Sequence, residues 1–230
     1  MGFDPGTLLP FLPEIFILAA ALLVLLSDVV GVRRLEAVGG LALAGLVAAL
    51  ALVLADLGFV PLLALRSLAA SSVDAAPAVG ALYAFTTLGL VFQAIFLLAS
   101  ILVALATLSR PSEQPGAAVF FGLLLLATLG MLLVAVAVDL IFLLLALEVT
   151  AISSYLLVGY PRRDPRGLEA AMKFYIIGAL SAAMSFFGAS LLYGAYGSTS
   201  LRVLGHALPG GANGELAIAG YAFLLVGLGF

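Results

Sequence analysis

The sequence predicts an all-α fold, a polytopic transmembrane helix bundle. Of its 230 residues, 65% are hydrophobic and only 9% are charged, whereas a typical soluble domain carries about 25% charged residues. The apolar residues also come in runs of roughly twenty, the length of helix that spans a bilayer. A water-soluble fold of this length has no interior large enough for so much apolar surface. We therefore expect residues 1–230 to form a single transmembrane domain in contact with the lipid bilayer.

Seven membrane helices are expected, the seventh ending with the sequence given. Charged and helix-breaking residues separate them. Asp28 precedes the first break, and Asp139 marks the nearly gapless turn between the fourth and fifth helices. The less apolar segments 58–79 and 198–214 are expected to be loops. The helices are expected at about 10–30, 37–57, 80–108, 117–138, 140–160, 167–195 and 215–230.

The distribution of arginine predicts the orientation in the membrane. The loops on one side hold only Arg66 and Arg202. We expect the richer side to be cytoplasmic and the N-terminus to face outward. The loops after the first, third and fifth helices hold Arg33, Arg34, Arg110, Arg162, Arg163 and Arg166.

Composition excludes several kinds of site on this chain. Because there is no Cys, disulfides, iron–sulfur clusters and thiolate zinc sites are excluded. The single His, His206, lies in a predicted loop and does not make a metal site. The net charge is −3 without a basic block, so no nucleic-acid partner is expected. No glycine-rich nucleotide motif or catalytic triad is present, and we expect no metal, no bound cofactor and no enzyme acting alone.

Glu148 is the first candidate for function. It lies near the middle of the fifth helix, about 16 Å of helix from Gly159, close to the centre of a ~30 Å hydrocarbon slab. A carboxylate at that depth costs at least ~2.5 kcal/mol by insertion scales. It must be protonated, paired or hydrated, as a proton relay requires; a satisfied structural carboxyl is the alternative.

Lys173, in the first half of the sixth helix, is the second candidate and the only Lys of the chain. It lies about 9 Å of helix from residue 167. Two interpretations stay open: a proton-relay amine, or a side chain that extends to the cytoplasmic interface. Glu169 lies one turn earlier on the same face, where it either pairs with Lys173 or contributes to a proton entrance.

Polar neighbours on the fifth helix are secondary candidates. Periodicity places Tyr155 on the face of Glu148, and Thr150, Ser153 and Ser154 on other faces. These hydroxyls either bond carbonyls of their own helix or hold water. Elsewhere, Gly178, Ala182, Ser181 and Ser185 are expected to form a helix-packing face, and Glu14, Asp28, Asp56 and Asp139 to lie at the membrane interface.

The chain resembles the antiporter-like subunits of respiratory complex I, most closely the N subunit of bacterial NADH–quinone oxidoreductase. Three stretches carry the resemblance: LLPEIFILAAALLVLLSD, the run from about 120 to 197, and the terminal GYAFLLVGLGF. It is most specific between Asp139 and Tyr175, where a helix-five Glu, an Arg-rich turn and a helix-six Lys occur together.

The resemblance implies a proton-translocating subunit of a translocase. Such subunits are built from inverted repeats with charged residues near the midplane. Glu148 and Lys173 match the family's relay residues, and the family pairs the Glu with a helix-seven Lys just beyond a GF pair, here Gly229 and Phe230. The chain is thus expected to be the front half of such a subunit. Its partners would be other membrane subunits, and partner subunits would hold NADH, flavin, iron–sulfur clusters and quinone.

Two alternatives remain. One is a subunit of a multi-protein sodium/proton antiporter, which shares the fold. The other is a structural or assembly component without a transport role, for which neutralising Glu148 and Lys173 would change stability alone.

Overall fold

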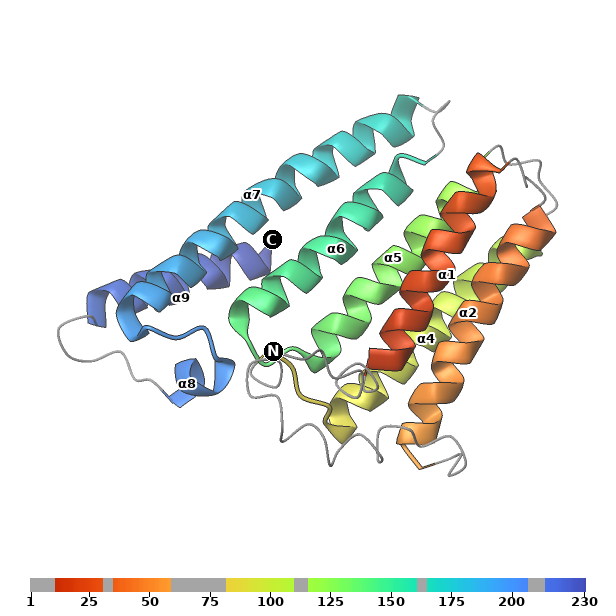
Figure 1. Cartoon of the computed structure of the whole chain (residues 1–230). Coiled ribbons are helices and arrows are strands. Elements are labelled where there is room, and N and C mark those ends of the chain that lie inside the picture. The colour runs from red at the N-terminus through yellow and green to blue at the C-terminus, as the bar shows by residue number, and fades with distance from the viewer. Residues whose placement is uncertain (1–10, 31–34, 59–81, 110–115, 161–164, 207–213) are drawn as a thin grey trace. The chain divides into compact units, whose positions relative to one another are not determined.

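The computed structural model describes residues 11–30, 35–58, 82–109, 116–160, 165–206 and 214–230. These ranges are almost entirely helical, and their extended pairings are two isolated β-bridges. The predicted all-α class is confirmed. In chain order (Figure 1) the helices are α1 (Leu12–Val29), α2 (Leu35–Asp56), α4 (Thr87–Leu108), α5 (Ala117–Val136), α6 (Leu140–Val158), α7 (Pro165–Tyr196), α8 (Leu201–His206) and α9 (Gly214–Gly229).

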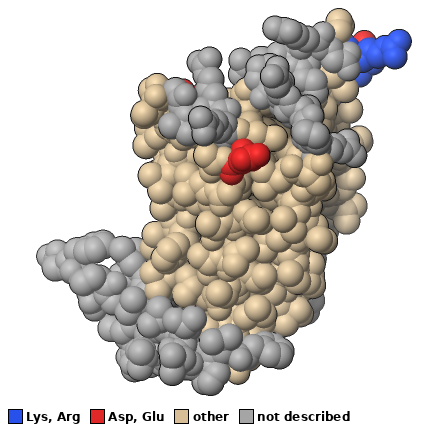
Figure 2. Space-filling view, turned by 90° about the vertical axis from the view of Figure 1, so that its right-hand side faces the viewer, with Lys and Arg blue, Asp and Glu red and all other residues tan. Residues whose placement is uncertain are grey.

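Six of these helices, α1, α2, α4, α5, α6 and α7, are long and apolar enough to cross a membrane. On the face drawn in Figure 2, the described surface is largely free of Lys, Arg, Asp and Glu, and the charged atoms visible there lie toward its upper end. An apolar exterior of this kind suits lipid, since acyl chains solvate it as well as a protein core would. The chain is a multi-pass membrane protein.

The third predicted helix begins later than expected. The structure starts α4 at Thr87, because Thr86 acts as its N-cap and accepts a hydrogen bond from the Gly89 amide at 3.1 Å. Leu82 and Tyr83 are extended instead, and they pair with the residues that follow α5. Hydropathy along the sequence cannot predict pairing between such distant residues.

The predicted loop 198–214 contains a helix, α8, which corrects the sequence interpretation. Its six residues are far too few to span a bilayer, so a search for long apolar runs misses it. Leu204 faces inward and is buried, whereas Arg202 and Val203 are exposed. His206 is the exposed last residue of this helix.

Several expectations lie outside the described residues. They include nearly all of the loop 58–79, most of the breaks at 110–116 and 161–166, and the arginines that predict orientation, apart from Arg166 and Arg202.

The described chain forms two compact units. The N-terminal unit holds α1, α2, α4 and α5. The C-terminal unit holds α6, α7, α8 and α9 together with residues 82–84.

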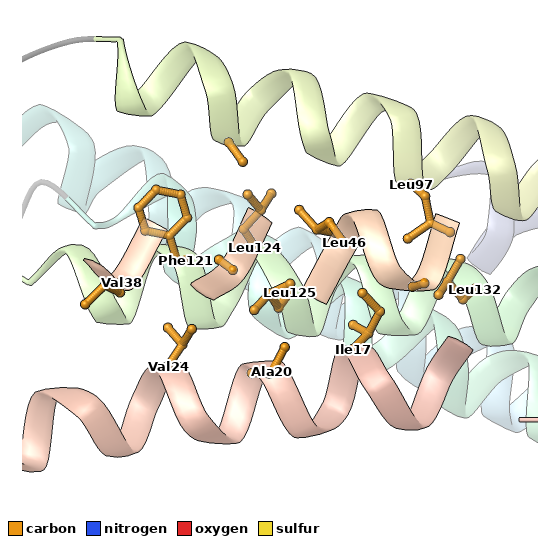
Figure 3. Close-up of a cluster of buried hydrophobic side chains, with 14 of the residues drawn as sticks. Ile17, Ala20, Val24, Val38, Leu46, Leu97, Phe121, Leu124, Leu125 and Leu132 are labelled. Carbon is orange, nitrogen blue, oxygen red and sulfur yellow. The ribbon is translucent and has the colours of Figure 1, made fainter. Parts of the chain in front are cut away.

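In the N-terminal unit, α5 packs against α1, α2 and α4, and α2 packs against α1 and α4. One apolar core joins the four helices, and Figure 3 shows its side chains converging. Residues three and four apart on each helix supply it, as a single buried face requires. It includes Ile17, Ala20 and Val24 of α1, Val38 and Leu46 of α2, Leu97 of α4, and Phe121, Leu124, Leu125 and Leu132 of α5.

In the C-terminal unit, α7 packs along both α6 and α9. The α7–α9 contact brings two backbones together at Gly188 and Gly220, where an added Cβ at Gly188 would lie 2.8 Å from the Gly220 carbonyl oxygen. The Ser181 hydroxyl donates to the Gly227 carbonyl of α9. The predicted packing face is therefore divided, since Ser181 and Ser185 face α9 while Gly178 faces α6.

Three connecting segments of the C-terminal unit pair with one another. The Val138 amide donates to the Leu82 carbonyl at 3.0 Å, and the Leu201 amide donates to the Val138 carbonyl at 2.9 Å. Asp139 caps α6, accepting from the Ile141 and Phe142 amides at 2.9 and 3.1 Å. We name this arrangement (residues 82–84, 137–139 and 199–201) the connector cluster.

Candidate functional site

Glu148 lies in the middle of α6. The helix begins at the Asp139 cap and runs through apolar residues to Val158. Glu148 is half-buried, and within the described part of the chain no hydrogen bond or ion pair reaches its carboxyl group. A carboxyl without a protein partner in an apolar helix must be neutral or hydrated.

The hydroxyls around Glu148 are used within α6. Ser153 donates to the Val149 carbonyl at 2.8 Å and Ser154 to the Thr150 carbonyl at 2.7 Å. The Thr150 hydroxyl contacts the Ala146 carbonyl at 3.4 Å. Bonding to the helix backbone, one of the two predicted uses of these side chains, is present in the structure. Their oxygens keep a lone pair for water, since a hydroxyl accepts as well as donates.

Tyr155 connects α6 to α7. Its side chain is buried, and its ring makes edge-to-face contacts with Phe174 and Tyr175 of α7, with ring centroids 4.8 and 6.0 Å apart. Sequence periodicity places Tyr155 on the face of Glu148. The structure adds the aromatic contacts that fix where this residue stands.

Lys173 pairs with Glu169 on its own helix. The Lys173 Nζ lies 2.6 Å from Glu169 Oε1, and the two side chains are 71% and 65% exposed. Pairing was one of the two uses predicted for Glu169. Between Glu148 and Lys173 the described residues contain no direct ion pair. The two candidates stand on neighbouring helices and do not form a contact pair.

A buried polar pair in the N-terminal unit escaped the sequence reading. Glu14, expected at the membrane interface, is only 3% exposed, and Gln93 of α4 is 0% exposed. The Gln93 Nε2 donates to Glu14 Oε1 at 2.6 Å and to the Leu132 carbonyl at 3.2 Å. The available signal was Gln93 itself, an amide side chain inside an apolar span.

A second such pair lies deeper along the same helices. The Ser100 and Thr128 hydroxyls lie 2.7 Å apart, joining α4 to α5. Each also lies within hydrogen-bond distance of the carbonyl four residues back; since a hydroxyl has one hydrogen, one of the two donates to the other, which donates to its own helix carbonyl. These groups are satisfied and serve helix packing.

The described residues contain no group of three His, Cys, Asp or Glu side chains that could hold a metal ion.

Comparison with known proteins supports the resemblance. The family model described as "NADH:quinone oxidoreductase/Mrp antiporter, TM" matches residues 137–230, the part of the chain that carries Glu148 and Lys173. NAD(P)H-quinone oxidoreductase subunit 2 of Synechocystis sp. is 35% identical over 237 residues, covering 99% of this chain and 42% of that protein. F(420)H(2) dehydrogenase subunit N of Methanosarcina mazei is 32% identical over 220 residues, covering 95% of this chain and 43% of that protein.

Solved structures agree with the sequence relatives. A chain of respiratory complex I from Thermus thermophilus with bound aureothin superposes with a TM-score of 0.68 and 29% identity, over 95% of this chain and 43% of that one. The membrane-bound sulfane sulfur reductase, an archaeal respiratory membrane complex, gives a TM-score of 0.68 at 20% identity over 97% of this chain and 44% of that one, which shows a shared fold.

The chain thus spans less than half the length of these relatives. The resemblance inferred from the sequence is confirmed over nearly the whole chain. The chain is therefore similar, over nearly its whole length, to the antiporter-like membrane subunits of complex I-type oxidoreductases, and its residues 137–230 match their family model.

Proposed function

We propose that this chain works as a proton-translocating membrane subunit of an NADH-quinone oxidoreductase complex, with Glu148 as its main proton carrier. The observation that carries the proposal is the half-buried Glu148 carboxyl, which has no hydrogen-bond or ion-pair partner among the described residues although it lies mid-helix in α6. A carboxyl in that setting takes up and releases a proton at little structural cost, because no protein bond has to break.

Lys173 is the second relay group in this proposal. Its ammonium is held by Glu169 one turn away on α7, and α7 packs against α6. Exposed pairs of this kind contribute little stability, so the Lys173 side chain can leave Glu169 at low cost. Glu148 and Lys173 would then exchange protons through intervening water.

The redox chemistry belongs to other subunits in this proposal. NADH, flavin, iron–sulfur clusters and quinone would bind partner chains, which fits the absence of Cys from this sequence. Partner membrane subunits and lipid would cover the apolar surfaces, and the arginine count would put the N-terminus outside a bacterial inner membrane.

The test uses the native complex in inverted membrane vesicles. Glu148→Gln should abolish NADH-driven proton uptake, because an amide cannot carry the proton. Lys173→Met should weaken it. Glu215→Gln, an exposed Glu of α9 in the same unit, is the matched control and should pump as wild type. Normal proton uptake by a fully assembled Glu148→Gln complex would overturn the relay.

A second candidate follows from the family model, whose description includes Mrp antiporters. In that case the chain would serve sodium/proton exchange. Sodium-dependent proton movement in vesicles that have no NADH-driven activity would favour it over the first proposal. A purely structural or assembly role predicts instead that Glu148→Gln changes the amount of assembled complex and nothing else.

A further inference from the structure

Tyr155 of α6 makes aromatic contacts with α7. Tyr155 follows Glu148 by two helical turns, so both side chains lie on the same face of α6. The Tyr155 ring rests edge-to-face on Phe174 and Tyr175, the two residues that directly follow Lys173. The face of Glu148 therefore reaches, through Tyr155, the part of α7 that carries Lys173.

Gly178 is what lets the Tyr155 hydroxyl reach the surface of α7. A Cβ atom at position 178 would collide with Oη and Cζ of Tyr155 and would lie 3.0 Å from its Cε1. The three nearest atoms all belong to Tyr155, so an added methyl group would push on that side chain. Glycine is unfavourable in a helix interior, and the close approach of Tyr155 supplies a reason for it here.

Tyr155 and Glu148 both present polar groups that water can reach, because neither the Tyr155 hydroxyl nor the Glu148 carboxyl is among the buried unpartnered atoms of the described residues. In the described residues neither group has a hydrogen-bond partner. A tyrosine hydroxyl normally finds one, and a water bridge is nearly as favourable as a direct bond. Two polar groups on one helix face are well placed to share such water.

We propose that Tyr155 is a positioning residue for Glu148. Docked against Gly178, its hydroxyl holds hydrogen-bonded water beside the Glu148 carboxyl and so governs how readily that carboxyl gains and loses its proton. Glu148 alone changes protonation state in this step: the proton adds to the carboxylate and later leaves it, while Tyr155 keeps its own proton and no electron moves. This inference rests on the proposed function.

Tyr155→Phe is the first variant to test, because it removes the hydroxyl and keeps the ring contacts. In the native complex, proton uptake per NADH oxidised should fall about two- to tenfold, the effect of losing one hydrogen bond. Gly178→Ala should give a similar fall by displacing the ring. Gly194→Ala is the matched control on the same helix, because its added Cβ would lie at an ordinary 3.4 Å from Leu216 Cδ2. The control should pump normally.

Infrared difference spectra then monitor Glu148 directly. The carboxyl stretching band of Glu148 is identified by its loss in Glu148→Gln. Tyr155→Phe and Gly178→Ala should both move this band, and Gly194→Ala should leave it in place. A role confined to packing would change the amount of assembled complex and would not move the band.

A double-mutant cycle tests whether Gly178 acts through Tyr155. Tyr155→Leu removes the atoms that a Cβ at position 178 would meet, so Gly178→Ala should add no further loss of pumping in that background. Losses that multiply would overturn the link. Wild-type pumping and an unmoved band in Tyr155→Phe would overturn the positioning role, even where Glu148→Gln still abolishes pumping. Full pumping by Glu148→Gln would instead remove the proposed function itself.

Discussion

Glu14 and Gln93 place a carboxyl and an amide inside the core of the N-terminal unit. Burying such groups is costly unless they bond one another. The 2.6 Å contact between Gln93 Nε2 and Glu14 Oε1 pairs the amide nitrogen, while Gln93 Oε1 is buried without a hydrogen-bond partner in the described part of the chain. The Gln93 amide also holds the Leu132 carbonyl. One side chain of α4 thereby ties together α1 and α5.

Replacing Gln93 with Leu should destabilise the protein. The substitution removes a donor from two buried acceptors, Glu14 Oε1 and the Leu132 carbonyl, which costs about 1–3 kcal/mol. The midpoint of thermal unfolding in detergent should fall.

Thr107→Val is the control on the same helix, since the Thr107 hydroxyl is exposed and bonds only its own helix at Val103. Its unfolding midpoint should match that of the wild type. A Gln93→Leu protein as stable as wild type would show that the buried tie contributes nothing.

The setting of a single residue could be predicted where it depends on depth along an apolar helix. It could not be predicted where it depends on a partner far away in the sequence. The mid-helix location of Glu148 could be read from the length of its apolar run. The burial of Glu14 depends on Gln93, 79 residues away, and no local pattern connects the two. The pairing of Lys173 with Glu169 is local, four residues apart on one helix, and the spacing alone made it foreseeable.

Helix α6 shows how a single capping residue sets an element's start. The Asp139 carboxylate accepts from the Ile141 and Phe142 amides, and the Thr199 hydroxyl donates to its other oxygen. The same residue therefore begins α6 and holds the connector cluster.

Asp139→Ala should lower stability by about 1 kcal/mol for the lost cap, and further for the lost bond to Thr199. Asp139→Asn should retain most of the cap, because asparagine is an equally good N-cap residue. Thermal unfolding of the purified protein checks the order wild type, Asn, Ala. Equal midpoints for the Asn and Ala variants would show that the cap is unimportant.

The helices fall into the same two groups: some can be predicted from the local sequence, and others depend on distant residues. Apolar length marks the candidate spans α1, α2, α4, α5, α6 and α7, since a run of about twenty apolar residues is long enough to cross a bilayer as one helix. The start of α4 and the existence of α8 depend on pairing and packing with distant residues. Hydropathy along the sequence predicts neither the start of α4 nor the presence of α8.

For the whole molecule, a testable consequence is the orientation that arginine predicts. These 230 residues include no Cys, so single cysteines can be introduced without background labelling from this part of the sequence. Ser109→Cys, at the end of α4, should react with a membrane-impermeant maleimide from the cytoplasmic side. His206→Cys, at the end of α8, should react from the opposite side.

Both positions are exposed, so failure to label would not follow from burial within the chain. Labelling of both cysteines from the same side would contradict the predicted topology. Labelling of Ser109→Cys from outside and of His206→Cys from the cytoplasm would show that the orientation is the reverse of the prediction.

Membrane class and helix content follow from composition, a property summed over the chain. The division into two units does not, because it depends on which helices pack together. Helices α2 and α5 have similar mean hydropathy, yet α5 is the more deeply enclosed in the structure.

The connector cluster also bears on biosynthesis. Residues 82–84 leave the ribosome long before residues 199–201, with which they share the 137–139 segment. Domains tend to fold in the order of their synthesis, and the N-terminal unit has all of its helices once Val136 has emerged. The segment 137–139 can pair with 82–84 once it has emerged, whereas its other partner, 199–201, follows only after about sixty further residues have been translated. One edge of the segment 137–139 therefore stays unpaired during that interval.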